Sequence, residues 1–187
     1  LLAFARLSRA PLHQAEVNMS LLATECFEEV CPPEQNLSVE FLLHDLPPAS
    51  ADESMVRQVF LNLYSNSIKF RKTTANSWIE TGFIQLHGQT VYFVSDNGIG
   101  FNMKSAAKLF EVFERLTAEF EGTGVGLAIV QQIIKRHGGS VAGYGEPGIG
   151  TTFYFSLAPV KEFASVTDTF GPTRHRGGTT SPPGLQG

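Results

Sequence analysis

The sequence predicts a two-layer α/β sandwich, in which one mixed sheet carries its helices on one face. Two observations support this fold class. The predicted elements follow the order helix, strand, helix, two strands, helices and two strands, which is not the alternation of a doubly wound fold. The 187 residues, 42% of them hydrophobic, are enough for one well-packed domain and a tail, but not for two large domains.

The first half of the chain contains two predicted helices with one strand between them. Residues 1–7 have the propensity of a helix end, and Pro11 follows the break after it. Ser20 is predicted to cap a helix, because apolar residues recur at helical spacing from there until Pro32. Residues 39–43 alternate like a strand. Asp52 is predicted to cap a long amphipathic helix that ends near Phe70.

The second half predicts two strand pairs and two helices. Strands at 78–87 and 90–95 are joined by a tight connection at 87–89. A short helix near 104–110 follows, and a longer one is opened by glycines 122–126 and ended by the Gly-Gly pair at 138–139. Strands at 141–145 and 151–157 form a closing hairpin across 146–148.

The apolar pattern fades after Pro159, which predicts a disordered tail. We therefore expect the end of a helix and a linker at 1–15, one domain at 16–160 and a disordered tail or linker at 161–187. Because the first residue is Leu1, we expect the chain to be part of a longer protein.

Composition excludes several classes of function. The net charge is −4 and the basic residues form no stripe, which argues against a nucleic-acid partner. The apolar runs fall far short of the roughly 20 residues that span a bilayer, so we expect no membrane insertion by this segment. Cys26 and Cys31 are too few for a disulfide framework or a zinc site. We interpret them as reduced thiols and expect a cytoplasmic location, which a membrane tether elsewhere in the full-length protein would allow.

A polar ridge interrupts the long helix at NLYSNSIKF (62–70). Asn62 and Asn66 are four residues apart, so their amides share one helix face, and Lys69 lies close to it. An amide oxygen is a hard ligand that suits Mg²⁺ carrying nucleotide phosphates, and a lysine offers a compact positive charge to them. The alternative is that the asparagines only face solvent.

DNGIG (96–100) follows a strand directly. Gly98 and Gly100 permit unusual backbone conformations and leave room for a flat ring. Asp96, if buried, accepts hydrogen bonds only, which matches the amino group of adenine, whereas guanine presents an oxygen there. The alternative is an ordinary turn, which explains the glycines but not the aspartate.

EGTGVGLAIV (121–130) has three alternating glycines just before an amphipathic helix. Backbone N–H groups and the positive end of the helix would face one point there, which predicts a phosphate-binding loop. The spacing is neither the dinucleotide fingerprint nor the P-loop pattern. A flexible hinge is the alternative.

Five segments in this order resemble sensor histidine kinases of the GHKL superfamily (HATPase_c domains), and phytochrome-type kinases most of all. NLYSNSIKF, DNGIGF (96–101), FEVFERL (110–116), EGTGVGLAIV and GIGTTFYFSL (148–157) resemble the N box, the first glycine box, the F box, the second glycine box and the final glycine-threonine segment. The resemblance covers residues 19–159 and implies a Bergerat-type ATP-binding fold. LLAFARL (1–7) resembles the end of the dimerisation hairpin's second helix.

The resemblance also implies roles for single residues. Asn66 would ligate Mg²⁺, Asn62 and Lys69 would serve the phosphates, and Asp96 would hold the adenine amino group. Arg115 would neutralise γ-phosphate charge during transfer, or alternatively is a solvated lid residue. The other expected ATP contacts are Phe70, Gly98, Ile99, Gly100, Gly122, Thr123, Gly124, Val125, Gly126, Leu127 and Thr152.

The implied function is that of a Mg²⁺- and ATP-dependent protein-histidine kinase in two-component signal transduction, a phosphorelay. Its partners would be a histidine-bearing dimerisation hairpin in a homodimer and a response regulator. Two departures stand out: the lid at 115–122 is slightly short, with Thr117 where relatives tend to carry His, and no phosphoacceptor box is visible.

Two alternatives compete with this function. A related GHKL ATPase that activates water would need a carboxylate near the N box, where this chain has Asn62. A nucleotide-binding but catalytically degenerate regulatory domain is favoured by the altered lid and disfavoured by the intact Asn66 and Asp96.

The five histidines lie away from any predicted phosphate contact, so we expect the acceptor histidine to lie outside this chain. His44 falls in a strand pattern, His87 in a strand connection and His175 in the tail, while His13 lies in a loop. His137 ends a helix, where we expect a cationic ring that caps it.

Overall fold

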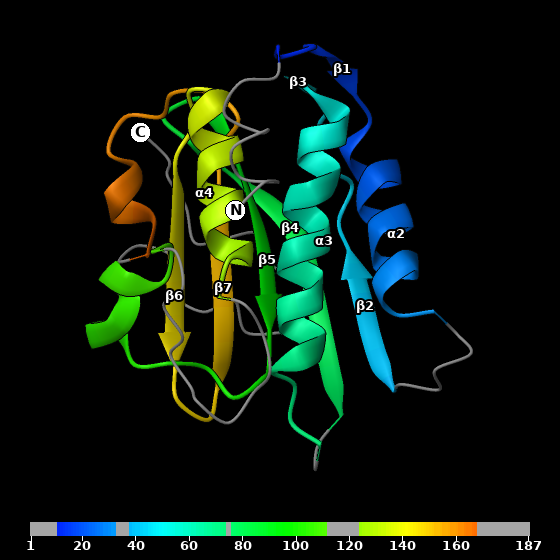
Figure 1. Cartoon of the computed structure of the whole chain (residues 1–187), viewed down its shortest axis with the longest axis vertical. Coiled ribbons are helices and arrows are strands. Elements are labelled where there is room, and N and C mark those ends of the chain that lie inside the picture. Colours follow the sequence, from blue (N-terminus) through cyan, green and yellow to red (C-terminus); the bar gives the residue numbers. More distant parts are fainter. Residues whose placement is uncertain (1–10, 33–37, 74–75, 112–123, 168–187) are drawn as a thin grey trace.

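A computed structural model describes residues 11–32, 38–73, 76–111 and 124–167 of the chain. Three helices cover one face of a five-stranded sheet (Figure 1), which confirms the predicted α/β sandwich. The elements are β1 (Ala15–Val17), α2 (Met19–Val30), β2 (Val39–Leu43), β3 (Ala49–Ala51), α3 (Glu53–Lys69), β4 (Ser77–Leu86), β5 (Gln89–Asp96), η2 (Met103–Lys108), α4 (Gly126–Arg136), β6 (Val141–Glu146), β7 (Gly150–Phe155) and η3 (Phe163–Ser165).

The sheet is mixed, with the strand order β2-β4-β5-β7-β6. β2 pairs parallel to β4, and the other neighbours are antiparallel. The β4–β5 hairpin turns on His87 and Gly88, both at positive φ (50° and 75°), as a two-residue hairpin loop requires. The short strands β1 and β3 form a separate two-stranded ribbon, which the sequence analysis did not predict because three residues are too few to show a period.

The main core lies between α2, α3, α4 and one face of the sheet. The helix α3 contributes six buried residues to it, Met55, Val56, Val59, Phe60, Leu63 and Tyr64. The Tyr64 hydroxyl is 3.0 Å from the hydroxyl of Thr81 on β4, so the one polar atom of this large side chain is satisfied inside the core. The central helix is therefore fixed directly over the middle of the sheet.

The caps of α2 and α3 are two short polar side chains. Asp52 caps α3 as predicted, and accepts from the Met55 N–H at 3.2 Å. The prediction for α2 is wrong by two residues: Asn18, not Ser20, caps it, with a 3.0 Å bond from the Leu21 N–H. The Ser20 hydroxyl instead accepts from the Leu46 N–H at 2.8 Å, which ties α2 to the segment before β3.

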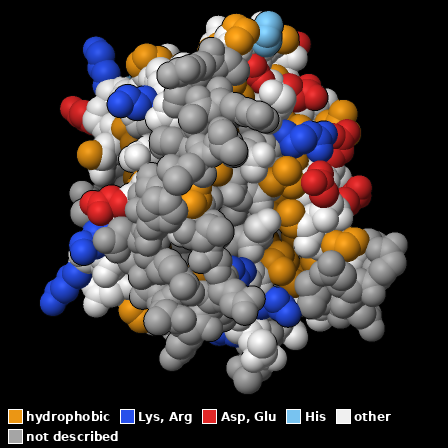
Figure 2. Space-filling view, viewed as in Figure 1, with side chains coloured by type: hydrophobic (Ala, Val, Ile, Leu, Met, Phe, Trp, Pro, Cys, Tyr) orange, Lys and Arg blue, Asp and Glu red, His pale blue; other side chains and the backbone are white. Residues whose placement is uncertain are grey.

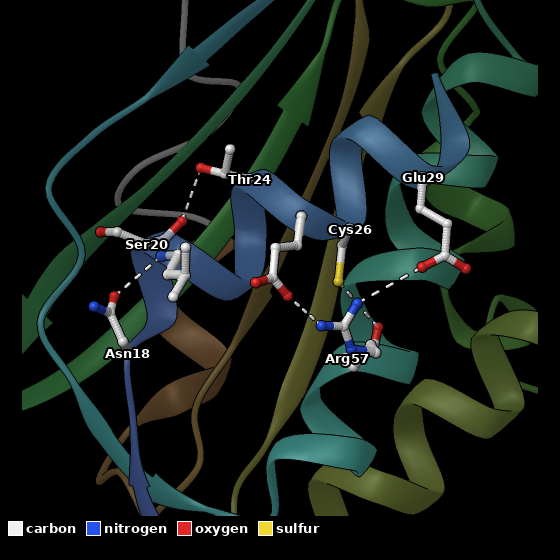
Figure 3. A network of polar contacts seen from close by, with 8 residues as sticks. Asn18, Ser20, Thr24, Cys26, Glu29 and Arg57 are labelled. Carbon is white, nitrogen blue, oxygen red and sulfur yellow. Dashed lines mark hydrogen bonds and ion pairs between the residues drawn. The ribbon is translucent and has the colours of Figure 1, made fainter. Parts of the chain in front are cut away.

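Polar contacts join α2 to α3 at the side of the sandwich (Figure 3). Arg57 on α3 is paired with Glu25 and lies 3.6 Å from Glu29, both on α2. Figure 2 shows acidic and basic side chains next to one another over this region. The Cys26 thiol lies beneath and contacts the Arg57 carbonyl at 3.7 Å. Burial raises the pKa of Cys26 to about 11, so this free cysteine stays a protonated thiol at neutral pH.

His137 joins the end of α4 to the start of α3. Its buried ring accepts from the Asp52 N–H at Nε2 (3.0 Å) and contacts the Ile133 carbonyl through Nδ1 (2.8 Å). A ring nitrogen that accepts from an N–H carries no proton, so the hydrogen is on Nδ1 and the ring is neutral. His137 is therefore the C-cap of α4 as predicted, but the prediction of a cationic ring is wrong, because one ring nitrogen accepts from the Asp52 N–H.

The second face of the sheet carries a smaller core under residues 160–166. Phe163 and Val166 are buried against four sheet residues, Leu86, Val91, Phe93 and Tyr154. Along their strands these residues alternate with residues of the main core, so they point to the other face of the sheet. Residues 161–167 thus belong to the folded part, beyond the domain boundary predicted at residue 160. The sequence does not reveal this segment, because two apolar residues among polar ones give no recognisable pattern.

No helix within the described ranges combines the length and the apolarity that crossing a lipid bilayer would require.

The second core predicts that residues after 160 stabilise the domain. Phe163→Ala should lower the free energy of unfolding by about 3 kcal/mol, because it removes a buried ring and leaves a cavity. Leu21→Ala is the matched control, since Leu21 is 56% exposed and should change stability by less than about 0.5 kcal/mol. Urea denaturation of both variants measures this, and equal small effects would show that the C-terminal segment does not pack on the sheet in solution.

Candidate nucleotide-binding site

Three motifs from distant parts of the sequence meet at one end of the sandwich. The helix α3 and the strand β5 both run downward in Figure 1 and end there, and the N-terminal end of α4 is the lower end of that helix. Asp96 is the last residue of β5 and the first of DNGIG, and Asn66 and Lys69 lie in the last turn of α3. The predicted site residues in the described part of the chain are thus brought together, with Thr152 as an exception.

The Asp96 carboxylate is buried and surrounded by donors. Oδ2 accepts from the Ser67 hydroxyl at 2.7 Å, and Oδ1 accepts from the Gly98 N–H at 2.9 Å. The backbone N–H of Thr151 lies near enough to the same carboxylate to lower its pKa. Burial raises the pKa of Asp96 to about 6, although these hydrogen bonds and the charge of Lys72 oppose the shift. At neutral pH the site therefore offers a buried, charged acceptor.

Asn97 anchors the loop that follows Asp96. Its side-chain oxygen accepts from the Trp78 N–H at 2.9 Å, and its amide nitrogen donates to the Asn76 carbonyl at 2.7 Å. Both partners lie at the start of β4, whose backbone pairing with β5 ends at Asp96. The Asn97 side chain therefore supplies the hydrogen bonds that the next residues of β5 would otherwise make. The asparagine of DNGIG is therefore structural, and it leaves Asp96 as the chemically distinctive residue of the motif.

The two glycines of DNGIG allow the loop to pass between neighbouring backbones. A Cβ on Gly98 would lie 2.6 Å from the Phe70 carbonyl oxygen. Gly100 has a φ of 66°, and a Cβ there would lie 2.0 Å from the Glu146 carbonyl oxygen. The close approach of protein backbone thus accounts for both glycines, in addition to the room for a flat ring that the sequence suggested.

A closed ring of three hydrogen bonds joins the segments at this end. The Ile99 N–H donates to the Phe70 carbonyl (3.0 Å), and the Gly148 N–H donates to the Ile99 carbonyl (2.8 Å). The Lys72 ammonium donates to the Gly148 carbonyl at 2.5 Å. Because Lys72 lies two residues after Phe70, this third bond closes the ring. Lys72 was not predicted, because nothing in the sequence links it to a turn 76 residues away.

The asparagines of α3 face the start of α4. The Asn62 amide nitrogen donates to the Gln58 carbonyl at 2.7 Å, and its oxygen lies 2.8 Å from where a Cβ on Gly126 would be. Gly126 therefore lets the two helices approach. Asn66 is half-buried, and its side chain bonds to no other described residue. The Lys69 ammonium lies 4.7 Å from the centre of the Phe70 ring, in a cation–π contact.

The N-terminus of α4 has no side-chain cap. Val125 occupies the N-cap position without a side-chain hydrogen bond, and Gly124 before it has a φ of 66°. The first N–H groups of the helix are thus left for another acceptor, as the predicted phosphate loop requires. Leu127 packs against the main core and holds the helix start in place. Gly122, Thr123 and Arg115 lie outside the described residues, as do Thr117 and the whole of the predicted lid at 115–122.

The structure places Thr151, and not Thr152, beside Asp96. Thr152 is fully buried on the opposite face of the sheet, where its hydroxyl is 2.7 Å from that of Ser95. Thr151 is paired with Asp96 across β5 and β7, so their side chains share the face covered by the helices. A Cβ on Gly150 would lie 1.9 Å from the Asp96 carbonyl oxygen, so β7 approaches this strand end very closely. The sequence carries a signal for Thr151, because alternate residues of a strand share a face. In TTFYF (151–155), Thr151 therefore shares the face of the core residues Phe153 and Phe155.

The donor set fits a Mg²⁺ ion that arrives with a nucleotide. Groups of three or more His, Cys, Asp or Glu side chains able to hold a metal are absent from the described ranges, so a metal held by protein carboxylates alone does not fit there. Mg²⁺ keeps most of its ligands as water and phosphate oxygens and needs only one or two from protein. The half-buried Asn66 amide, one helical turn after the Asn62 that faces Gly126, matches that requirement.

Residues 51–161 match the family described as histidine kinase-, DNA gyrase B-, and HSP90-like ATPase. The chain is 35% identical over 165 residues to cyanobacterial phytochrome B of Nostoc sp., covering 86% of this chain and 22% of that protein. It is 40% identical over 111 residues to the methanogenesis regulatory histidine kinase FilI of Methanothrix harundinacea, covering 59% of this chain and 12% of FilI. The chain thus spans about a fifth or less of the length of these relatives.

Solved structures resemble this fold as well. The crystal structure of full-length ShkA in complex with AMPPNP superimposes with a TM-score of 0.71 at 29% identity, over 85% of this chain and 34% of that one. The catalytic domain of the histidine kinase ThkA gives a TM-score of 0.65 at 25% identity, over 79% of this chain and 99% of that one.

The burial of Asp96 predicts an unusual titration in the unliganded chain. Its carboxyl carbon should titrate near pH 6 in carbon-13 NMR, and the signal should be missing from Asp96→Asn. The pKa is raised above 3.8 in the folded state, so between about pH 4 and 6 the folded state binds more protons than the unfolded state. The free energy of unfolding should therefore fall as the pH rises from about 4 to 6. Denaturation of the parent and of Asp96→Asn across this range isolates the fall. A midpoint at or below pH 4 would contradict the buried position.

Proposed function

The chain belongs to the histidine kinase-, DNA gyrase B- and HSP90-like ATPase family, and we propose that it is the ATP-binding catalytic domain of a two-component sensor histidine kinase. The observation that carries the proposal is the arrangement around Asp96: a buried acceptor lies at the same end of the sandwich as Asn66 and the uncapped start of α4. One small ligand with a donor group, a metal-binding group and an anionic group would satisfy all three features.

We propose that adenine lies against Asp96 and the phosphates against the start of α4. The exocyclic amino group of adenine would donate to Asp96, and guanine would be excluded because its oxygen would face the carboxylate. Asn66 would be the protein ligand of Mg²⁺, and Asn62 and Lys69 would lie along the phosphates. Bound Mg²⁺ would neutralise phosphate charge. Gly124, Val125, Gly126 and Leu127 would supply backbone N–H groups, and Thr151 takes the place first predicted for Thr152.

The reaction we propose is transfer of the γ-phosphate of ATP to a histidine on the dimerisation hairpin, and then to an aspartate of a response regulator. Catalysis would consist of positioning and charge neutralisation, for which Arg115 remains a candidate. The full-length protein would act as a homodimer. Because ATP is its substrate, we propose the cytoplasm as its site of action.

The four described histidines support an acceptor elsewhere. His13 and His137 both bond to Asp52, which lies 14 residues from Asn66 and thus about 20 Å away along α3. His87 is in the turn at the opposite end of β5 from Asp96. His44 is 2.7 Å from Glu80, on the sheet face opposite to the helices.

A water-activating ATPase is less well supported than a kinase. Asn62 stands where such an enzyme needs a carboxylate, and its amide nitrogen is used by the Gln58 carbonyl. An amide cannot take a proton from water at neutral pH. A regulatory domain that only binds nucleotide would share the site as described, and phosphotransfer separates it from a kinase.

Asn66→Ala should abolish Mg²⁺-dependent ATP binding and leave the fold intact, because it removes an oxygen ligand from a half-buried position on an unchanged helix. Isothermal titration with Mg-ATP measures the affinity, and circular dichroism the fold. Ser65→Ala is the matched control, since Ser65 is the exposed neighbour on the same helix turn. An affinity for Mg-ATP unchanged in Asn66→Ala would contradict the assignment.

The chain alone should bind ATP without phosphorylating itself on histidine. Incubation with γ-labelled ATP, followed by acid and base treatment, tests this, because phosphohistidine is acid-labile and base-stable. We expect such a label only on a dimerisation hairpin fragment of the full-length protein, when it is added. Acid-labile, base-stable label on the isolated chain would overturn the expectation.

A further inference from the structure

We propose that Ser67 is a positioning residue of the base site: its hydroxyl orients the Asp96 carboxylate and keeps it charged for the ligand's amino group. The proposal rests on the proposed ATP site and assigns a role to Ser67, which lies within NLYSNSIKF but is not among the expected ATP contacts. Its consequence is that Ser67 sets the pH range in which the domain binds nucleotide.

The geometry of Ser67 shows a dedicated contact. The residue is 3% exposed in the last part of α3, directly after Asn66, and its hydroxyl lies 2.7 Å from Asp96 Oδ2. A serine in a helix commonly bonds back to the carbonyl four residues before it. Ser67 instead donates across to the end of β5, 29 residues away. The buried Ser67 hydroxyl therefore holds Oδ2 of the Asp96 carboxylate in place.

Counting the acceptor sites of Asp96 shows what remains for a ligand. An ionised carboxylate offers about four lone-pair positions. Gly98 takes one on Oδ1 and Ser67 takes one on Oδ2. About two positions are left, and their directions are fixed because these two donors hold the carboxylate plane. A ligand amino group would therefore meet a pre-oriented acceptor.

The charge of Asp96 depends on the same contacts. Burial favours the neutral form, and the hydrogen bond from Ser67 is the strongest of the effects that oppose it. The groups that face the carboxylate are Ser67 from α3, Gly98 from the loop, Thr151 from β7 and Lys72 from the segment after α3. Lys72 carries the charge among them. Removing the Ser67 hydroxyl should therefore raise the pKa of Asp96 further.

The test is the pH dependence of Mg-ATP affinity in the parent and in Ser67→Ala, measured by calorimetry between pH 5.5 and 8.5. A protonated Asp96 is a poorer acceptor, so affinity should fall as the pH drops through about 6 in the parent. In Ser67→Ala the midpoint should rise by about one pH unit, as expected for the loss of a hydrogen bond to a charged group. The factor by which the variant is weaker should thus be about fivefold larger at pH 6 than at pH 8.5, where only the lost orientation of the carboxylate remains.

Two controls make the result specific. Protonation of ATP itself affects both proteins alike, so the ratio of their affinities is the quantity compared. Ser95→Ala removes another buried hydroxyl, one residue before Asp96 but bonded to Thr152 on the other sheet face, and should leave the midpoint unchanged. An unchanged midpoint in Ser67→Ala, or a loss of affinity by the same factor at every pH, would overturn the proposal. Absence of Mg-ATP binding by the parent at any pH would instead refute the proposed function.

Discussion

The Asp96 carboxylate ends a central strand with only 8% of the residue exposed, and burying a charge there costs free energy unless donors surround it. Much of the local structure at this end of the molecule meets that requirement. Ser67 comes from the helix layer, Gly98 from the loop and Thr151 from the neighbouring strand. Gly98 and Gly150 have no side chains because the backbone must crowd around the same point. The motif is thus organised around an acceptor that is charged but almost inaccessible.

The sequence was sufficient where a pattern extends over many residues. Strand alternation at 39–43 and helical spacing up to Phe70 predicted β2 and α3, and Asp52 was correctly identified as a cap. The glycine-rich motifs located the end of the molecule where the predicted site residues meet. These signals are local or repeated, so they survive without knowledge of tertiary contacts.

The failures share a different cause: each depends on a partner distant in sequence. Ser20 looks like a cap, but the Leu46 N–H takes its hydroxyl. His137 looks like a cationic helix end, but the Asp52 N–H makes its ring neutral. Thr151 and Thr152 are adjacent and identical, and only the register of β7 against β5 separates the residue beside Asp96 from the one beneath the sheet. Phe163 and Val166 are isolated apolar residues until the second sheet face is known.

The ring of hydrogen bonds formed by Phe70, Ile99, Gly148 and Lys72 has a mechanical consequence. It links three segments pairwise, so each segment is held by two of the three bonds. Swinging any one of them outward breaks two bonds at once, whereas an open chain of contacts would lose only one at its end. None of the three segments can therefore move away from this end of the sandwich alone without breaking two hydrogen bonds.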